Sequence, residues 1–372
     1  MNQRGYDVII IGAGIIGLCT AFYSAKAGLR VAVLDRSIPG SGTTSKAAGM
    51  LGIQAEFSSP NPLYHLAKES IALYKTLTDE LLEYQTTSFG WTRSGAVKLA
   101  FNNSEHKQLS VIQSWQMQHG DTAELLDQQS LQFLAPAVNK EALAGLYFPN
   151  EAHVQPTQVA RAFEHSLYEL GVDLFPYTTA TSVSTHRVTT RTDTLYGEQI
   201  VIATGHESFA NIPWPVTPVK GEIIKVRPRR QLSKQTIFYN GWYAVPKPDG
   251  EWLLGATSTH SEDTSISVSG VLELLTNIQA CLPDIKDSDI TAMWSGIRPK
   301  STADSPFISP HPTLHGVWLV GGHNRNGILL GPITGKRVTE HLLGIKVNDA
   351  FTSIKVGEHH EYHHQSEKSQ FT

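Results

Sequence analysis

Three glycines near the N-terminus have the spacing of a dinucleotide-binding turn. Gly12, Gly14 and Gly17 follow the apolar run 8–11, and small and apolar residues at helical spacing continue over 18–27. In such a turn the first glycine permits a tight bend, the second lets the backbone approach a pyrophosphate, and the third lets helix and strand pack closely. The N–H groups at the helix start attract phosphate. We predict a dinucleotide site here, with a purely structural βαβ turn as the alternative.

A second apolar run, 31–34, ends at Asp35. An acid roughly twenty residues after such a motif can accept hydrogen bonds from a ribose 2′-OH. The next segment, 40–52, is rich in small residues. Its backbone can therefore lie against a flat ring, although a plain flexible loop is the alternative. The glycine motif by itself is compatible with either FAD or NAD.

The composition limits the classes of function. The 372 residues are 40% hydrophobic and 17% charged, which is enough apolar material for a sizeable core and two domains. The formal net charge of -4 argues against nucleic acid as a main partner, because phosphate binding needs a clustered basic face. The one short basic cluster, predicted to be a solvated loop, consists of Arg227, Arg229, Arg230 and Lys234.

The cysteines and the N-terminus carry little functional signal. The two cysteines, Cys19 and Cys281, do not form a Cys-x-x-Cys pair, so no zinc or dithiol site is predicted, and Cys19 is expected to be buried. The chain starts directly with a strand pattern and shows neither a signal peptide nor an apolar run long enough to cross a bilayer. We therefore expect a soluble cytoplasmic protein.

Residue periodicity places the elements that would position these groups. Buried strands are predicted at 8–11, 31–34, 91–100, 172–175, 200–205 and 317–322, and antiparallel strands at 219–226 and 237–257 with a turn at Asp249-Gly250. Helices are predicted at 18–27, 62–85, 108–118, 127–134, 156–170 and 335–343.

This order of elements predicts an α/β fold of two domains (α+β in their arrangement). A Rossmann-like nucleotide-binding domain would be discontinuous, built from 1–85, 150–215 and 300–345. A largely antiparallel substrate domain with helices would come from 86–149 and 216–299. The polar tail 357–372 contains two His-His pairs, for which a solvated tail is favoured over a metal site.

Five further segments carry a more specific likeness: Ser45 to Gly52, Pro218 to Glu222, Gly255 to Thr257, Trp294 to Pro299 and Gly322 to Leu330. With the glycine motif and Asp35, in this order, they resemble the glycine oxidases of the D-amino-acid oxidase/sarcosine oxidase family of FAD-dependent oxidoreductases. The likeness covers about residues 6 to 345.

The resemblance implies noncovalent FAD and oxidative deamination of a small amine or amino acid. A hydride would pass from the substrate Cα to flavin N5, the imine would hydrolyse to an oxo acid and ammonia, and O₂ would reoxidise the flavin to give H₂O₂. For glycine the oxo acid is glyoxylate, and in the family the imine also serves thiamine thiazole synthesis. Covalent sarcosine oxidases use a C-terminal cysteine, and this chain has none after Cys281. The resemblance also implies a homotetramer.

The resemblance and the chemistry of carboxylate binding together indicate the substrate residues. Arg298, expected at a strand end before Pro299, suits a substrate carboxylate because a guanidinium binds it with two hydrogen bonds, and a surface ion pair is the alternative. Tyr243 matches a family tyrosine that reaches the same carboxylate, with a core tyrosine as the alternative. Arg325 matches a family arginine near the substrate, and capping of loop carbonyls is equally compatible. The remaining residues assigned to the substrate pocket are Met50, Gly52 and Ser258.

The predicted FAD contacts come from four parts of the chain. They are Gly12, Ala13, Gly14, Ile15, Ile16, Gly17, Asp35 and Arg36; Thr43, Thr44, Ser45, Ala47, Ala48, Gly49 and Met50; Ala203, Thr204 and Gly205; and His323, Asn324, Arg325, Asn326, Gly327, Ile328 and Leu329. No side chain is proposed as a catalytic acid or base, because an amine that binds neutral needs none. No metal ligand is proposed.

Two positions depart from the glycine oxidase pattern. Gly241 stands where a histidine can occur, and Ser258 stands where a methionine can line the pocket. Sarcosine, small N-alkyl glycines and small D-amino acids therefore stay open as substrates. Two other functions also stay open: a dehydrogenase with a non-oxygen acceptor, and a flavoprotein that modifies a partner protein.

Overall fold

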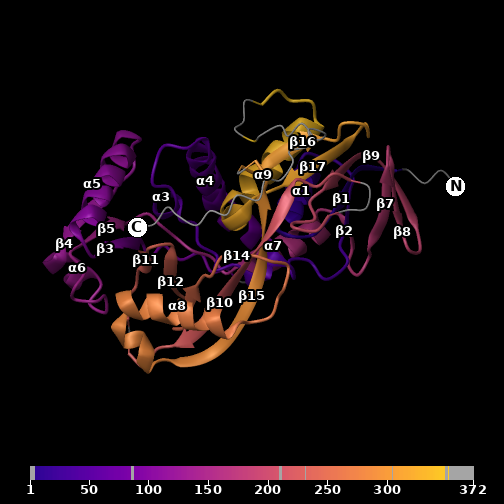
Figure 1. The fold of residues 1–372 in the computed structure, drawn as a ribbon. Coiled ribbons are helices and arrows are strands. Elements are labelled where there is room, and N and C mark those ends of the chain that lie inside the picture. The colour runs from indigo at the N-terminus through magenta and orange to yellow at the C-terminus, as the bar shows by residue number, and fades with distance from the viewer. Residues whose placement is uncertain are drawn as a thin grey trace.

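The structure is a computed structural model that describes residues 5–84, 88–208, 212–230, 232–303, 305–347 and 351. It contains two sheets with helices packed against each, which confirms the α/β class (Figure 1). The predicted polar tail 357–372, with its histidine pairs, lies outside the described residues. The predicted domain boundaries stay a prediction.

The first sheet has a parallel centre. Its order is β16 (Phe307–Pro310), β17 (Val317–Gly321), β9 (Thr194–Ile202), β1 (Tyr6–Ile11), β2 (Val31–Leu34) and β6 (Asp173–Phe175), and only β16 on this path pairs antiparallel. A hairpin of β7 (Ala180–Ser184) and β8 (Arg187–Thr190) pairs with β9. The central strands are covered on both faces, so their sequences are continuously apolar.

Four helices pack around this sheet. They are α1 (Ile15–Lys26), α4 (Pro62–Leu82), α7 (Pro156–Glu169) and α9 (Gly327–Leu342). Helices α1 and α9 come so close that a Cβ on Gly335 would lie 2.5 Å from the carbonyl carbon of Cys19, and Cys19 is fully buried as predicted.

The second sheet is largely antiparallel, as predicted. Its path is β14 (Thr259–His260), β10 (Val216–Arg227), β13 (Trp252–Gly255), β12 (Trp242–Pro246), β11 (Thr236–Tyr239), β3 (Ala96–Ala100), β5 (Ala144–Phe148) and β4 (Glu124–Asp127). Strand β15 (Asp289–Ser301) pairs along β10, and the one parallel pairing among the described strands of this sheet is β3 with β11.

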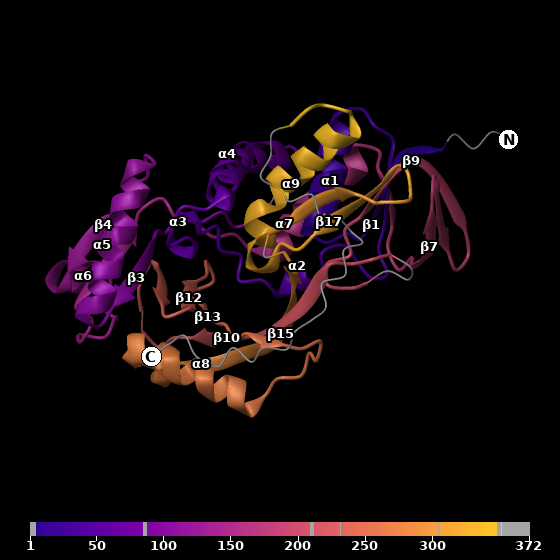
Figure 2. The same cartoon turned by 45° about the horizontal axis from the view of Figure 1, so that its top comes forward.

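Helices cover the second sheet at two places. Helix α8 (Val268–Cys281) packs against β10, β12 and β13 and is followed by the short turn η1 (Pro283–Asp287), while α5 (Asn103–Gln118) and α6 (Gln128–Leu134) lie with β3–β5 at the far left (Figure 1). The long strands β10 and β15 run together toward the first sheet (Figure 2). No helix in the described part of the chain combines the length and the apolar character needed to cross a membrane.

Several element boundaries differ from the sequence prediction. Helix α9 begins at Gly327 rather than Gly335, because Pro332 is accommodated inside the helix instead of preceding it. Helix α5 begins at Asn103, where the side chain of Asn102 caps Glu105 N. The β7–β8 hairpin was not predicted, since its strands are short and polar. Arg298 lies inside β15 and not at a strand end.

The contact between α1 and α9 generates a stability prediction. Gly335→Ala should lower the free energy of unfolding by about 1–3 kcal/mol, because the methyl group would meet the backbone of Cys19, which cannot move aside. Gly331→Ala in the same helix is the matched control. Its Cβ would lie 3.0 Å from a side-chain atom of Ile15, so the loss should be smaller. Urea unfolding of both variants measures the difference, and equal stabilities would contradict the prediction.

Candidate active site

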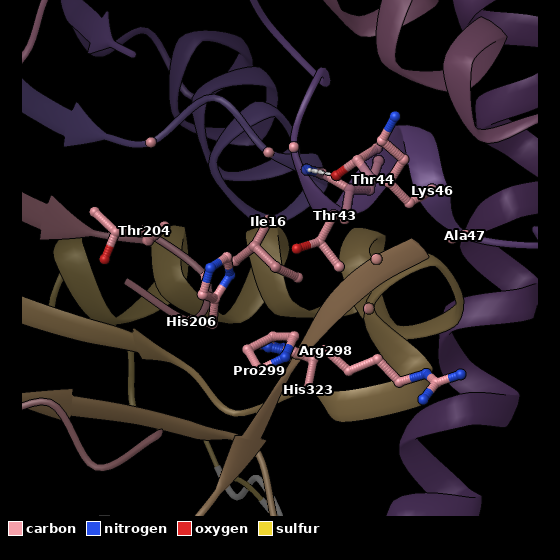
Figure 3. A pocket seen from close by; sticks show the side chains of 18 of the residues that line it. Ile16, Thr43, Thr44, Lys46, Ala47, Thr204, His206, Arg298, Pro299 and His323 are labelled. Carbon is pink, nitrogen blue, oxygen red and sulfur yellow. Dashed lines mark hydrogen bonds between the residues drawn. The ribbon is translucent and has the colours of Figure 1, made fainter. Parts of the chain in front are cut away.

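A cavity of about 620 Å³ lies where the parallel strands end. Its lining includes Ile11, Leu34, Ala203 and Gly321, which stand at or next to the carboxyl ends of β1, β2, β9 and β17, and it extends to the second sheet. Ligands of open parallel sheets bind at this edge. In the view of Figure 3, Thr204 and His206 lie to the left and the guanidinium of Arg298 to the right.

The glycine turn has a different steric reason at each position. Gly12 has a φ of +104°, and a Cβ there would lie 2.4 Å from the carbonyl oxygen of Ala203. A Cβ on Gly17 would lie 1.8 Å from the carbonyl oxygen of Gly12, so Gly17 serves helix–strand packing and does not line the cavity. At Gly14 the nearest atom, Thr44 Oγ1, is 3.6 Å away. A side chain at position 14 would therefore not clash with other protein atoms. The absence of one instead lets a ligand approach the backbone closely, which fits a pyrophosphate-binding turn.

Asp35 is held at the cavity wall by backbone donors. Its Oδ2 accepts a hydrogen bond from Ala13 N at 2.7 Å, and its Oδ1 accepts one from Ser37 N at 2.8 Å. Each carboxylate oxygen keeps a further lone pair that a hydroxyl group can use. Beside it, Ile15 N donates to Thr44 Oγ1 at 2.9 Å, the bond drawn in Figure 3. This hydrogen bond joins the glycine turn to the segment that contains Thr44 within the protein itself.

Some polar lining residues were not predicted from the sequence. Glu207 and His206 line the cavity after the end of β9, and Glu207 forms an ion pair with Arg36, which was predicted. Thr178 and Thr181 line the same region. In the sequence these residues are marked only by their position after the strands β6 and β9, which end at this edge of the sheet.

The small-residue segment is partly helical. Residues Thr43–Lys46 form the short helix α2, and Thr43 Oγ1 donates to the carbonyl of Ile297 at 2.7 Å. Gly49 has a φ of +80°, and a Cβ there would lie 2.2 Å from Val154 O. Of the residues predicted in this segment, only Ser45 does not line the cavity, and its hydroxyl donates to Ser41 O.

A buried lysine supports this segment from behind. Lys247 Nζ donates to the carbonyl of Ala48 at 2.6 Å and to that of Val154 at 3.2 Å. Burial lowers the pKa of Lys247 to about 7. Glu151, on the neighbouring segment, accepts from Gln54 N at 2.6 Å, and burial raises its pKa to about 8. Neither Lys247 nor Glu151 was predicted from the sequence, because a single charged residue in a turn region does not form a recognisable motif.

The far end of the cavity holds two arginines and a tyrosine. Arg298 is largely enclosed, and its Nη1 donates to Thr257 O at 3.1 Å. A Cβ on Gly221 would lie 2.1 Å from Arg298 Nη2, and one on Gly255 would lie 2.4 Å from the Tyr243 hydroxyl. Glycines therefore make room for both side chains. Burial raises the pKa of Tyr243, and the nearby positive charge of Arg298 acts in the opposite direction.

Arg325 has an acidic partner that sequence reasoning missed. Its Nη2 lies 3.2 Å from Oε1 of Glu56, at the end of the short helix α3 (Ile53–Glu56), and both residues line the cavity. Met50 and Gly52 line this end as well. Ser258 does not. It lines a smaller neighbouring cavity of about 140 Å³ that shares Arg298, Asn324 and Arg325 with the large one.

The segment after β17 completes the lining. His323, Asn324, Arg325, Asn326, Gly327, Ile328 and Leu329 all reach the cavity. His323 Nε2 lies 2.9 Å from Thr334 Oγ1, and burial lowers the pKa of His323 to about 3, so this imidazole is neutral. Apart from Gly17, Ser45 and Ser258, every residue predicted for the cofactor or substrate lines the large cavity.

Comparison with known proteins assigns the fold to a family. The family model described as FAD dependent oxidoreductase matches residues 7–341. The chain belongs to this family of FAD-dependent oxidoreductases. FAD is thus the cofactor, and the cavity fits it: the glycine turn and the anchored Asp35 lie at one end, and Ala47 to Met50 line the wall farther along. Among the described residues, no group of three or more His, Cys, Asp or Glu could hold a metal ion.

Several relatives are named glycine oxidase. The chain is 37% identical to a glycine oxidase of Geobacillus kaustophilus over 91% of this chain and 93% of that protein, and 33% identical to one of Bacillus licheniformis over 98% and 100%. A solved structure of the Geobacillus kaustophilus enzyme superposes with a TM-score of 0.87 at 34% identity, covering 92% of this chain and 96% of that one. A bifunctional ThiO/ThiG protein of Trichormus variabilis is 29% identical, and there the chain covers 52% of the relative's length.

A buried histidine behind the cavity wall generates a pH prediction. His153 is 0% exposed, neither ring nitrogen has a hydrogen-bond partner among the described residues, and its backbone forms β-bridges with Met50 and Thr92. Burial, reinforced by the charge of Lys247, lowers its pKa from 6.5 to about 3. Below pH 6.5 the unfolded chain takes up a proton that the folded chain does not, so stability is lost progressively toward pH 3.

His153→Leu should flatten this acid-side loss in melting temperature of the FAD-loaded protein. His165→Gln, on the exposed side of α7, is the control and should leave the profile unchanged. Thermal unfolding between pH 7 and pH 4 measures both. A His153→Leu profile parallel to that of the wild type would contradict the assignment.

Proposed function

We propose that the protein oxidises glycine, with sarcosine and small D-amino acids as further candidate substrates, to the oxo acid, ammonia and H₂O₂ with noncovalently bound FAD. The observation that carries this proposal is the placement of the enclosed Arg298 next to Tyr243 at the far end of the cofactor cavity. A cation and a phenol hydroxyl there match a small carboxylate. The two glycine oxidases that are 33% and 37% identical over nearly the whole chain support the choice of glycine.

The protein groups act by binding and orienting the substrate. The guanidinium of Arg298 would hold the carboxylate with two charged hydrogen bonds, and the Tyr243 hydroxyl would donate a third. This fixes the Cα relative to the wall formed by Ala47 to Met50. When bound, FAD supplies the hydride acceptor for that Cα. Enclosure strengthens these interactions, since water no longer competes for the charged groups.

No side chain is assigned as a general base. Glu56 is the carboxylate that lines the substrate end, and it is already engaged by Arg325. Lys247 is occupied by two carbonyls behind the wall. An amine that binds in its neutral form loses hydride without proton removal by the protein.

Noncovalent binding of FAD is supported by the cysteines. Cys19 lies in α1 and Cys281 ends α8, both are buried, and neither lines the cavity. A thiolate that could bond the flavin ring is therefore not in reach. A role in thiamine thiazole synthesis belongs to the same proposal and is supported by the bifunctional ThiO/ThiG relative.

Substitution of the carboxylate-binding arginine tests the substrate assignment. Arg298→Ala should keep the flavin absorbance but raise the KM for glycine about 30-fold or more, because loss of a largely enclosed charged partner costs about 2–5 kcal/mol. Arg229→Ala is the control, since Arg229 is exposed and pairs with Asp289 on the surface. Steady-state kinetics measures both variants. An unchanged KM in Arg298→Ala would overturn the assignment.

Anaerobic reduction tests the activity itself. Glycine added to the yellow holoenzyme without oxygen should bleach the flavin absorbance, and air should restore it with release of peroxide. Sarcosine and D-alanine added in the same way rank the substrates. Bleaching without reoxidation by air would indicate a dehydrogenase with another acceptor. Persistent yellow colour with all three amines would overturn the proposal and favour a partner protein as the substrate.

A further inference from the structure

Glu222 is a buried carboxylate on the face of β10 that is turned away from the cavities. Successive side chains of a strand point to opposite faces. Val219, Gly221 and Ile223 line the cavities, so Lys220 and Glu222 point to the other face. Glu222 is only 3% exposed and lines neither cavity. An effect of this carboxylate on a ligand in the cavities must therefore pass through another residue.

The pairing of β10 is irregular at Glu222. Strand β10 pairs with β13 through residues 223–226 and with β14 through residues 219–220. Between these stretches, the two remaining residues of β10 lie opposite the three residues 256–258. An extra residue on one strand leaves part of its backbone unpaired and re-aims it. The backbone of Thr257 is therefore not fixed by the sheet ladder.

The side chain of Thr257 replaces the missing strand pairing. Its Oγ1 accepts a hydrogen bond from Glu222 N at 2.8 Å and donates one to Glu222 Oε2 at 3.2 Å. Thr257 is 4% exposed, so water does not compete for the hydroxyl group. Because the hydroxyl is used as donor and as acceptor by one residue, Glu222 fixes both the place and the orientation of Thr257.

The carbonyl group of Thr257 anchors Arg298. Arg298 Nη1 donates to Thr257 O at 3.1 Å and lies 3.5 Å from Lys220 O. A Cβ on Gly221 would lie 2.1 Å from Arg298 Nη2, so the guanidinium lies directly against β10. A guanidinium is planar and its N–H groups have fixed directions. The place of Thr257 O therefore sets the direction of the donors that a carboxylate would use.

The carboxylate of Glu222 is itself held by the start of α8. Ser267, the N-cap of this helix, donates from its backbone N to Oε1 at 2.7 Å and from Oγ to Oε2 at 3.3 Å. A Cβ on Gly270 would lie 1.7 Å from Oε2, so the first turn of α8 closes over the carboxylate. The carboxylate therefore cannot swing away from Thr257.

The charge of Glu222 is compensated on its own face of the sheet. Lys220 Nζ lies 3.5 Å from Glu222 Oε1 and 3.5 Å from Oδ2 of Asp263. The link from Glu222 to Arg298 is consequently one of hydrogen-bond geometry. Removal of the Thr257 hydroxyl alone should then have the same effect as a change at Glu222.

We propose that Glu222 is a positioning residue for substrate binding, which acts through the Thr257 hydroxyl to hold the guanidinium of Arg298 in the orientation that binds a carboxylate. The proposal rests on the proposed function only in that Arg298 binds the substrate carboxylate.

Two variants of Thr257 test the link without turnover. Acetate has the carboxylate of glycine but no amino group, and its binding to the FAD-loaded protein can be followed by the flavin absorbance. Thr257→Val keeps the shape of the side chain and should weaken acetate binding about fivefold or more, because it removes two hydrogen bonds. Thr257→Ser retains the hydroxyl and should bind acetate within about twofold of the wild type.

The same two variants separate positioning from a general structural defect. The Kd for FAD should be the same in Thr257→Val, Thr257→Ser and the wild type, since only the orientation of Arg298 changes. Equal losses of acetate affinity in both variants, or a parallel loss of FAD affinity in Thr257→Val, would overturn the proposal.

Glu222→Gln tests the carboxylate itself. It should weaken acetate binding to a similar extent, because an amide offers only one of the two acceptor oxygens that Ser267 and Thr257 use. Glu251→Gln is the matched control. Glu251 is 5% exposed in the same sheet and has Lys225 and Arg227 as its partners, so acetate affinity should be retained. Equal acetate affinities in the two glutamine variants would contradict the assignment.

Combined variants show whether the residues act as one link. Glu222→Gln with Thr257→Val should bind acetate no more weakly than the weaker single variant, and Glu222→Gln should cause no further loss in an Arg298→Ala background. Additive losses in either combination would place the effect outside this link and overturn the proposal.

The outcome for Arg298 separates the two proposals. If Arg298→Ala loses acetate affinity while Thr257→Val binds acetate like the wild type, the carboxylate assignment stands and the positioning role fails. If Arg298→Ala binds acetate like the wild type, the carboxylate assignment fails and the positioning role fails with it. If the acetate results are as expected but no amine bleaches the flavin, the positioning role stands and the oxidase function fails.

Discussion

The nucleotide side of the molecule depends on backbone contacts that only glycine permits. Gly12 brings the end of β1 against Ala203, Gly17 brings α1 against Gly12, and Gly335 brings α9 against Cys19. Each contact leaves less than the space of a methyl group, so the distances between β9, β1, α1 and α9 are fixed by backbone rather than by adaptable side chains. The start of α1, Asp35 and the segment 323–329 are positioned relative to one another through these contacts.

On the substrate side glycines also permit close contacts, but there they make room for side chains instead of bringing backbones together. Gly221 and Gly255 leave space that is filled by Arg298 and Tyr243, so large polar side chains lie flat against a sheet. A largely enclosed guanidinium is costly without an anion, and the hydrogen bond from Arg298 Nη1 to Thr257 O satisfies one of its donors without cancelling its charge. The positive charge of Arg298 therefore remains available to bind an anionic ligand. Arg325 differs, because Glu56 already neutralises it.

Much of this organisation could be predicted from the sequence because it rests on local signals. The glycine motif, the apolar runs of β1 and β2, and Asp35 lie close together in the chain, and their physical roles are independent of the rest of the fold. Arg298, Tyr243 and Arg325 were predicted through a family resemblance, since nothing in their spacing shows that β12, β15 and the segment after β17 converge.

The groups that were missed act through contacts between distant segments. Glu56 pairs with Arg325, and Lys247 binds Ala48 and Val154, so their importance is visible only when the chain is folded. Ser258 was predicted to line the main pocket, yet the register of β14 against β10 places its neighbourhood at the smaller cavity. The start of α9 was predicted too late because a proline inside a helix has the same local signal as one before it.

The path of the chain between the two sheets has a mechanical consequence. The chain passes from one sheet to the other between β2 and β3, β5 and β6, β9 and β10, and β15 and β16, and the β-bridge of Lys300 with His323 adds a further link. A pair of layers joined by one or two strands can open like a hinge, but covalent links at several separated points block such rotation. Exchange of small molecules with the enclosed end would then depend on movements of side chains and loops more than on separation of the two layers.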